Sequence, residues 1–427
     1  MRRQPRLLGA LAAVVLLAAA AAGCGSGSQS PSAGSTITVS HGYTDVEAAA
    51  LKKQVAQWNS DHPDQKVKLA FNGGNDSALQ KIVAGFTAGN FPDASYQYGS
   101  SAAQLARQPK LVDLTDTVQD PDVDWEDFYP SERDAATVDG KVVGIPALVD
   151  NLALVYNKKL FEEAGVPLPT ADWSWDDFRA AAAKLTDEST KTHGWAYVND
   201  GSEDTVWRYL ALLWQAGGDL LTEDDSKPAF DSPAGEAALT LLQQMGVQDK
   251  SVYLDNGNGN YLNLFNSGKI AMLWTGPWDL SSINDDVDYG VQVLPGFQGN
   301  HETISGPDLY LAFDQSDARA RTAVAFLTWL TSAKVHLDFA IATGDLPLRK
   351  SESELPGYQT FLDKYPSNKV FVQNLDNVRH VRPNIPQYAE VSTAVGQMVQ
   401  SVLLGQAEPK EALDSAGDQV TSVLSGQ

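Results

Sequence analysis

One aspartate stands between two apolar segments of this chain, where a charged side chain needs a reason. Val142 and Val143 belong to a short β-prone run, and residues 152–156 form a nearly continuous apolar run, typical of a strand covered on both faces. Asp150 lies between them. An ionised carboxylate has two acceptor oxygens and can engage two neighbouring hydroxyl groups of a ligand. The alternative is a structural aspartate that caps a local turn together with Asn151.

Tryptophans are the second candidates for ligand contact. Trp278 follows a Gly-Pro turn, and its flat indole can stack on the apolar face of a ring-shaped ligand at little conformational cost. Packing in the core is the alternative, because most buried tryptophans only pack. Trp207 is a similar candidate, but Trp214 lies one or two helical turns further on, and at least one of the two must be a core residue.

Catalytic and metal-binding patterns are weak in this sequence. The six histidines show no paired spacing, and no Gly-x-Ser-x-Gly motif occurs. The segment Asp255–Asn260 lacks the ligand spacing and terminal glutamate of a calcium loop, so we expect a turn there. The carboxylates of Asp120–Asp127 suggest a glycosidase, but their setting favours a loop that enters a helix. We therefore expect a binding protein without metal or cofactor, and no enzyme.

The charge of the chain argues against nucleic acid as a partner. The chain has 31 basic and 54 acidic residues, and its formal net charge is −23 at pH 7. Phosphate binding depends on clustered lysine and arginine, which the sequence does not show. An acidic surface instead suits an exported protein that must not adhere to anionic lipids or cell-wall polymers.

The first 35 residues predict export. A basic start is followed by an apolar stretch over residues 7–22, so residues 1–23 read as a signal peptide. The only cysteine, Cys24, ends the sequence Ala-Ala-Gly-Cys, which resembles a bacterial lipobox and implies diacylglycerol on Cys24. Ala21 departs from that pattern, which more often has leucine, so plain secretion is the alternative. Residues 24–35 are rich in glycine and serine and predict a flexible linker.

The chain after residue 35 alternates predicted strands and helices, and its length suggests at least two units with a core each. Thr44 with Glu47, and Ser174 with Asp177, have the spacing of helix capping boxes. Alternation of strand and helix is the signature of a parallel α/β sheet, whose ligand crevice is formed by loops at the carboxyl ends of strands. In the first third of the chain these loops are 41–43, 73–75 and 97–101.

Six segments then occur in a recognisable order and spacing. They are FPD (91–93), GKVVGIP to YNKKLFEEAG (140–165), FNSGKIAMLWTGPW (265–278), YGVQVLPGF (289–297), GDLPLRK (344–350) and RPNIPQY (382–388). Together they resemble the extracellular solute-binding proteins that serve sugar ABC importers, with the maltodextrin-binding group as the best match. The resemblance covers nearly the whole chain after the export signal.

The resemblance implies a two-lobed α/β fold of the periplasmic-binding-protein type, class II. Each lobe would have a central, mostly parallel sheet flanked by helices, with the ligand cleft between the lobes. The chain would cross between lobes near Val149, near 295–297 and near 345–350. The first lobe would then comprise 36–149 and 297–346, and the second 150–296 and 347–427.

The resemblance also implies which residues contact the sugar. Asp150 and Trp278 match a carboxylate and a stacking tryptophan of relatives, and Trp207 falls near a cleft aromatic. Loops that approach the cleft in relatives add further candidates: Gln97, Tyr98, Ser100, Asp308 and Arg349. His41 is a candidate because it follows the first predicted strand and can donate or accept a hydrogen bond. For His41 the alternative is a solvated loop residue, and for Asp308 and Arg349 it is a mutual or surface ion pair. Residue types at 97–100 differ from those of maltodextrin binders, which leaves the particular sugar open.

The expected function is that of a monomeric, lipid-anchored protein on the extracellular side, which captures an oligosaccharide or other sugar and delivers it to a membrane permease. A hinge between lobes would let the permease distinguish loaded from empty protein. The alternatives are a binding protein for a polyamine, peptide or glycerol phosphate, and an exported carbohydrate-active enzyme. A phosphate would need several convergent arginines or lysines. A polyamine would need aromatic and acidic residues, which this cleft can supply.

Overall fold

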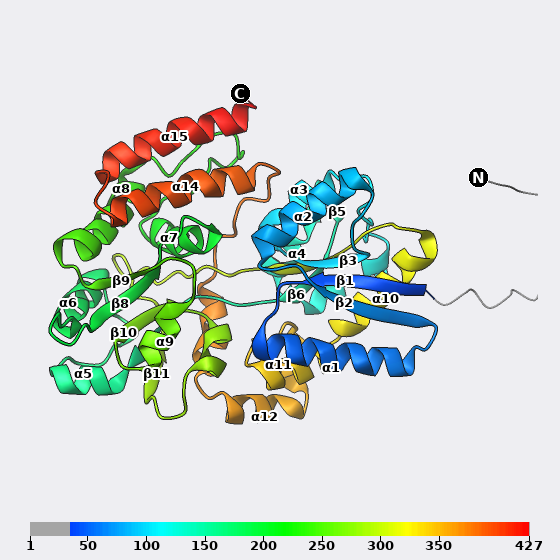
Figure 1. The fold of residues 1–427 in the computed structure, drawn as a ribbon, viewed down its shortest axis with the longest axis horizontal. Helices are drawn as coiled ribbons and strands as arrows, with labels where there is room; N and C mark the ends of the chain where they lie inside the picture. The colour runs from blue at the N-terminus through cyan, green and yellow to red at the C-terminus, as the bar shows by residue number, and fades with distance from the viewer. Residues whose placement is uncertain (1–34, 427) are drawn as a thin grey trace, which may run out of the picture.

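The computed structural model describes residues 35–426, which form two α/β lobes side by side (Figure 1). The two-lobed α/β fold predicted from the sequence is confirmed. The predicted signal peptide, Cys24 and nearly all of the predicted linker lie outside the described residues.

The first lobe is built on a five-stranded sheet with the order β2-β1-β3-β12-β6. β1 pairs in parallel with β2 and β3, whereas β12 runs antiparallel to β3 and to β6. The sheet is therefore mixed and not mostly parallel, because β12 reaches it from the other lobe and enters in the opposite direction. The strands are β1 Ser35–His41, β2 Gln65–Phe71, β3 Ala94–Tyr98, β6 Ile145–Leu148 and β12 Asp308–Ala312.

The second lobe also has a mixed five-stranded sheet, with the order β11-β7-β10-β8-β9. β8 pairs in parallel with β9 and β10, and β7 runs antiparallel to β10 and β11. Its strands are β7 Ala153–Asn157, β8 His193–Val198, β9 Val252–Asp255, β10 Ile270–Thr275 and β11 Tyr289–Gln292. A separate short ladder joins β4 Thr137–Val138 to β5 Lys141–Val142.

Helices cover the first sheet through apolar faces. α1 buries Leu51, Val55 and Trp58, which recur at helical spacing and face the core. The predicted capping box at its start is wrong, because the side chain of Thr44 makes no capping hydrogen bond. The helices of this part are α1 Asp45–Asp61, α2 Asn75–Ala88, α3 Ala102–Ala106, α4 Pro130–Ala135, α10 Asp317–Leu330, α11 Ala333–Thr343, α12 Gly357–Lys364 and α13 Asn368–Asn374.

Helices of the second lobe surround its sheet in the same way. The predicted capping box at the start of α6 is confirmed, since the backbone N–H of Asp177 donates to the Ser174 hydroxyl and the Asp177 carboxylate accepts from the Ser174 backbone. The helices are α5 Lys158–Ala164, α6 Trp175–Leu185, α7 Glu203–Gln215, α8 Pro233–Gln243, α9 Asn260–Asn266, α14 Tyr388–Leu403 and α15 Pro409–Ser425. Within residues 35–426, no single helix is long and apolar enough to cross a membrane; α10 and α11 qualify by length and composition only as a pair bent by 64°.

The third passage of the chain between lobes lies later than the sequence suggested. The prediction placed it near residues 345–350, but α12 packs against α11, which in turn packs against α1. A small apolar cluster of Leu337, Ala340 and Phe361 holds α12 there. The chain joins the second lobe at α14, which packs against α7 and α8.

Buried hydrogen bonds join the three passages to one another. The Asn151 side chain donates to the Phe371 carbonyl at 2.9 Å, and Asn374 donates to Asn151 Oδ1 and to the Leu152 carbonyl, both at 2.9 Å. The Thr303 hydroxyl donates to the same Leu152 carbonyl at 2.7 Å. Asn151, Thr303 and Asn374 are buried, so a polar group that lost its partner here could not bond to water instead, and the protein would lose stability.

We predict that Asn374→Ala lowers the free energy of unfolding by about 1–3 kcal/mol, because it leaves buried Asn151 Oδ1 without its donor. Denaturant unfolding followed by circular dichroism measures this loss. Asn256→Ala, at an exposed position in the loop after β9, is the control and is expected to change stability by less than about 0.5 kcal/mol. Equal stability of the two variants would contradict the role of this network.

Candidate functional site

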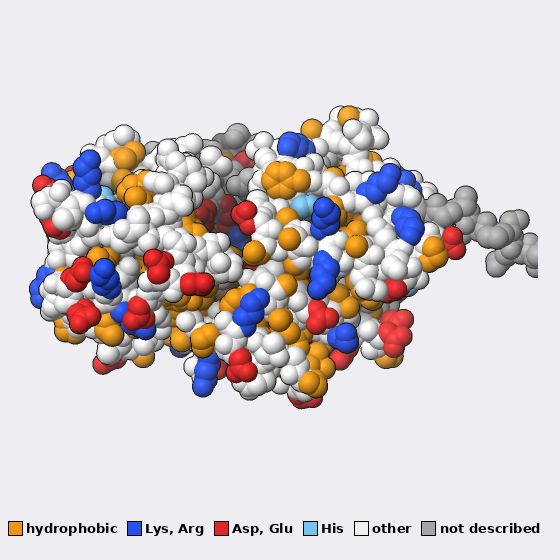
Figure 2. Space-filling model, turned by 60° about the horizontal axis from the view of Figure 1, so that its bottom comes forward, with side chains coloured by type: hydrophobic (Ala, Val, Ile, Leu, Met, Phe, Trp, Pro, Cys, Tyr) orange, Lys and Arg blue, Asp and Glu red, His pale blue; other side chains and the backbone are white. Residues whose placement is uncertain are grey.

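A cavity of about 310 Å³ lies between the lobes and takes residues from both. Figure 2 shows acidic side chains gathered in the hollow between the two halves of the molecule. The lining residues are Gly42, Tyr43, Glu47, Gly74, Tyr96, Tyr98, Leu148, Val149, Asp150, Glu203, Asp204, Trp207, Trp278, Gly306, Asp308, Asp345 and Arg382.

Strand ends position the wall that the first lobe contributes. Asp308, at the start of β12, is paired with Tyr98 at the end of β3 and with Leu148 at the end of β6. Because β12 is antiparallel to both neighbours, its first residue lies at the same edge as their last residues. Glu47 joins this wall from the first turn of α1, which follows β1.

Two tryptophans form the wall on the side of the second lobe. Trp207 comes from α7 and Trp278 from the turn after β10, and their ring centroids are 5.6 Å apart with a 52° tilt. Gly276 permits this arrangement, since a β-carbon there would lie 1.9 Å from the Trp278 ring. Trp207 Nε1 is buried without a hydrogen-bond partner among the described residues, so it can donate to a ligand.

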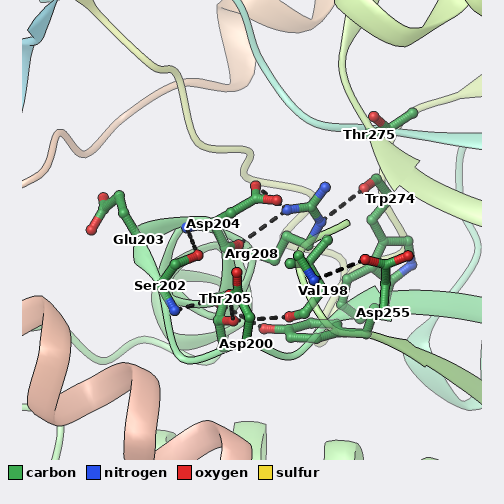
Figure 3. Close-up of polar contacts among 12 residues, drawn as sticks. Val198, Asp200, Ser202, Glu203, Asp204, Thr205, Arg208, Asp255, Trp274 and Thr275 are labelled. Atoms are coloured by element: carbon green, nitrogen blue, oxygen red, sulfur yellow. Dashed lines mark hydrogen bonds and ion pairs between the residues drawn. The ribbon is translucent and has the colours of Figure 1, made fainter. Parts of the chain in front are cut away.

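The first turn of α7 adds two carboxylates with different surroundings (Figure 3). Ser202 caps the helix by accepting from the Asp204 backbone at 3.2 Å. The Asp204 carboxylate accepts from Arg208, which also donates to the Trp274 carbonyl at 3.1 Å. Glu203 points away from this network and is bonded elsewhere.

Arg382 is the one cation among the lining residues, and it is already paired. Its Nη1 donates to Glu203 Oε1 at 2.9 Å, and its guanidinium carbon lies 5.6 Å from the centre of the Tyr98 ring. Glu203 also accepts from the hydroxyls of Tyr388, at 2.8 Å, and Ser392. The pair thereby connects the start of α7 to the segment that leads into α14.

Asp150 accepts a hydrogen bond from a different passage of the chain and does not cap a local turn. Its Oδ1 accepts from the Gly306 backbone at 2.8 Å, so two passages of the chain meet at this carboxyl group. Asp308 accepts from the Tyr96 hydroxyl through Oδ2, while its Oδ1 has no partner within residues 35–426. The same is true of Asp345 Oδ2. No group of three His, Cys, Asp or Glu in that part of the chain is placed to hold a metal ion.

Burial raises the pKa values of several of these carboxyl groups. It raises the pKa of Asp308 to about 7 and that of Glu47 to about 9, with the charge of Asp345 adding to both shifts. Burial and the charge of Asp308 hold the pKa of Asp150 well above its usual value, although Gly306 and Arg382 act in the opposite direction. Burial therefore disfavours the charged forms of Glu47, Asp150 and Asp308.

Five of the predicted site residues line the cavity together. They are Tyr98, Asp150, Trp207, Trp278 and Asp308. Of the two candidate tryptophans, Trp207 lines the cavity and Trp214 does not. The Trp214 indole donates to Asp219 at 3.0 Å and stacks on His380 outside the cavity.

The other predicted site residues do not line the cavity. Gln97 is fully buried and donates to Ser95 Oγ at 2.9 Å, because β3 turns its side chain into the lobe. His41 is buried at the end of β1, and Ser100 borders a neighbouring groove. Arg349 is wrongly placed by the sequence argument. It is buried over the Phe128 ring and donates to the carbonyls of Val123, Asp124 and Thr331, and it forms no pair with Asp308.

Sequence reasoning missed several lining residues, namely Glu47, Tyr96, Glu203, Asp204, Asp345 and Arg382, whereas Tyr43 lies in the loop 41–43 that it assigned to the crevice. Glu47 was assigned to a helix cap. Asp345 and Arg382 lie within segments that carry the family resemblance, and this position could have marked them as site residues. Glu203 and Asp204 begin the helix that follows the loop after β8.

Comparison with known proteins gives a family-model match over residues 43–336, to the bacterial extracellular solute-binding proteins. A binding protein of Brucella abortus (strain 2308) is 26% identical over 402 residues, which is 89% of this chain and 95% of that protein. The sn-glycerol-3-phosphate-binding periplasmic protein UgpB of Pectobacterium atrosepticum is 22% identical over 394 residues, 86% of each chain.

Solved structures resemble the whole two-lobed fold. An ABC substrate-binding protein of Listeria monocytogenes, in complex with cycloalternan, has a TM-score of 0.83 and 26% identity and covers 91% of this chain and 99% of its own. A solute-binding protein of Thermotoga lettingae bound with α-D-tagatose has a TM-score of 0.81 and 25% identity, with coverage of 91% and 99%. The predicted resemblance is thereby confirmed.

We predict that Asp308→Asn changes how stability depends on pH. The folded-state pKa of about 7 exceeds the ordinary value of 3.8. The protonated Asp308 therefore contributes fully to the free energy of unfolding below pH 3.8, and this contribution is lost as the pH rises through about 7. The variant avoids this loss. Its melting temperature, relative to that of the unmodified protein, should therefore be higher at pH 8 than at pH 4.

Thermal unfolding of both proteins at pH 4, 6 and 8 tests this expectation. Asp363→Asn, at an exposed position on α12, is the matched control and should show the same difference from the unmodified protein at every pH. A melting-temperature difference for Asp308→Asn that does not change with pH would refute the expected titration.

Proposed function

The chain belongs to the bacterial extracellular solute-binding protein family, and we propose that it is the lipid-anchored, sugar-binding receptor of an ABC importer. It is the substrate-binding component of an ABC transporter for sugars or related solutes. The family and its structural neighbours are binding proteins and not enzymes. The proposal adds the class of solute, the way it is held and the attachment to a membrane.

The observation that carries the sugar proposal is the opposition of two chemically different walls in one cavity. Trp207 and Trp278 offer flat apolar faces, which suit the C–H face of a sugar ring. Asp150 and Asp308 offer acceptor oxygens, which suit ring hydroxyl groups. A sugar needs both kinds of surface at once. The tryptophans come from the second lobe, Asp308 comes from the first, and Asp150 lies on a passage between them.

The volume of the cavity suits one or two sugar rings. About 310 Å³ is at the low end of ligand pockets, which range over roughly 300–1,000 Å³. A neighbouring groove shares Tyr98 and Glu203 with the cavity and continues along α2 and α14. This continuity supports an oligosaccharide whose first rings lie inside and whose remainder extends outward.

Delivery would follow from closure of the lobes around the sugar. Each wall belongs mainly to one lobe, so a bound ring contacts both lobes only when they approach each other. Differential contact of this kind shifts the population toward the closed form, and a permease can recognise that form. The passages around Asn151, Thr303 and Asn374 are where the chain would bend.

The geometry disfavours glycerol phosphate, although several relatives are named for that ligand. A phosphate prefers several converging cationic donors. Arg382 is the one lining cation in the described part of the chain, and Glu203 already occupies it. The remaining lining charges are acidic.

We predict that Trp278→Ala weakens binding of a sugar found by thermal-shift screening at least tenfold, about 1.4 kcal/mol, because one stacking face is lost. Isothermal titration calorimetry measures the dissociation constant. Trp329→Ala, on α10 away from the cavity, is the control and should keep the affinity within about twofold. If Trp278→Ala also keeps its affinity, the assignment of this wall is incorrect.

The lipid anchor has a separate test. Cells that express the protein and receive a radioactive fatty acid should label it, and Cys24→Ser should abolish the label and release the protein from the membrane fraction, since the only thiol is removed. Ser30→Ala, in the same linker, should leave labelling intact. An unlabelled parent protein would refute the anchor and leave the proposed sugar binding untouched.

A further inference from the structure

The lining residues of the cavity are unbalanced in charge. They include six carboxyl groups, from Glu47, Asp150, Glu203, Asp204, Asp308 and Asp345, and one guanidinium group, from Arg382. Two of the six have a cationic partner, since Glu203 pairs with Arg382 and Asp204 pairs with Arg208. The other four form no ion pair with any residue in the described range 35–426.

The unpaired carboxyl groups gather on the side of the first lobe. Asp308 and Asp345 are each only 4% exposed, and each has one buried oxygen with no hydrogen-bond partner within the described chain. Buried polar atoms are rarely left in this state. Glu47 lies on the same wall, and its pKa is raised partly by the charges of Asp345 and Asp308. A neutral hydroxyl group can satisfy one such oxygen, but it brings no charge to offset the repulsion.

An ammonium group fits this wall better than a hydroxyl group. It carries three donors on one atom, and its positive charge strengthens each hydrogen bond to a carboxylate. Two buried oxygens without donors, on neighbouring carboxyl groups of like charge, provide acceptors for such a group. The tryptophan wall opposite still requires a ring with an apolar face.

We infer that the cavity is selective for a sugar that carries a protonated amine, with the ring on Trp278 and Trp207 and the ammonium between Asp308 and Asp345. This inference rests on the proposed sugar-binding function and specifies its substrate class. The amine supplies the cationic partner that the acidic wall, formed by Glu47, Asp308 and Asp345, lacks within residues 35–426. The ring hydroxyls then use Asp150 and Trp207 Nε1.

Binding of the cation is coupled to proton release. Burial favours the protonated form of Asp308. The titratable groups that interact with it are Tyr43, Glu47, Tyr96, Glu132, Asp150, Tyr310, Asp345 and Arg382. An ammonium ion at this position favours the carboxylate, so the proton leaves as the amine binds. His336 also faces Asp345 and acts in the same direction as the ligand.

The test uses matched ligands that differ only at the amine. Calorimetry on the mature protein at pH 7 compares glucosamine with glucose and N-acetylglucosamine, and the glucosamine disaccharide with cellobiose and the diacetylated disaccharide. We expect at least one aminated sugar to bind tenfold or more tightly than its parent and its acetylated form. Titration in buffers of different ionisation enthalpy should show proton release for the aminated sugar.

Two variants link any preference to the acidic wall. Asp345→Asn and Asp308→Asn should each reduce the ratio of aminated to parent affinity to less than threefold, and the second variant provides the answer if the first does not fold. Asp363→Asn, on the surface of α12, should leave the ratio unchanged. An unchanged ratio in both cavity variants would overturn the inference.

The outcomes separate the inference from the proposed function. Equal or tighter binding of the parent sugars would overturn the amine selectivity and leave a sugar receptor. Binding of spermidine with no sugar bound would overturn both, in favour of a linear polyamine. An absence of binding by every sugar of the panel would also count against both.

Discussion

The buried hydrogen bonds among the three chain passages are the constraint on which the rest of the structure depends. Asn151, Thr303 and Asn374 hold three segments within one small buried network, and the bonded residues are 151 to 223 residues apart in sequence. The passages leave each sheet at the edge that faces the other lobe, so the cavity forms where they meet. Asp150 and Gly306 belong to these same passages and also line the cavity. The proposed hinge and the proposed ligand contacts therefore involve neighbouring residues.

Local features of the fold could be predicted because they depend on neighbouring residues. The capping box of Ser174 and Asp177 is confirmed, as is the α/β class with two lobes. Features that depend on distant partners were harder to predict. Thr44 and Glu47 have the spacing of a cap, yet the cavity places Glu47 elsewhere. The mixed sheets arise because β12 arrives from the other lobe, and no local pattern shows its direction.

The site was only partly visible in the sequence. A polar residue between apolar strands marked Asp150, and a Gly-Pro turn marked Trp278, and both line the cavity. Their contact with a ligand stays a prediction. Arg382 and Glu203 are 179 residues apart, and their pairing depends on how α14 returns to α7. Arg349 resembled a ligand-binding arginine, but backbone carbonyls that only the fold brings together occupy its guanidinium group.

The position of β12 also governs when the protein can fold. This strand starts at residue 308 and lies between β3 and β6, so the first sheet stays divided until more than two thirds of the chain has been made. Contacts between residues so distant form slowly, because a long loop must close before they contribute. The chain belongs to an extracellular family, and a member of such a family has to cross a membrane, so late closure of the sheet would keep it unfolded for longer during its synthesis. The strand order that places Asp308 at the cavity thus also sets how late in synthesis the first sheet can close.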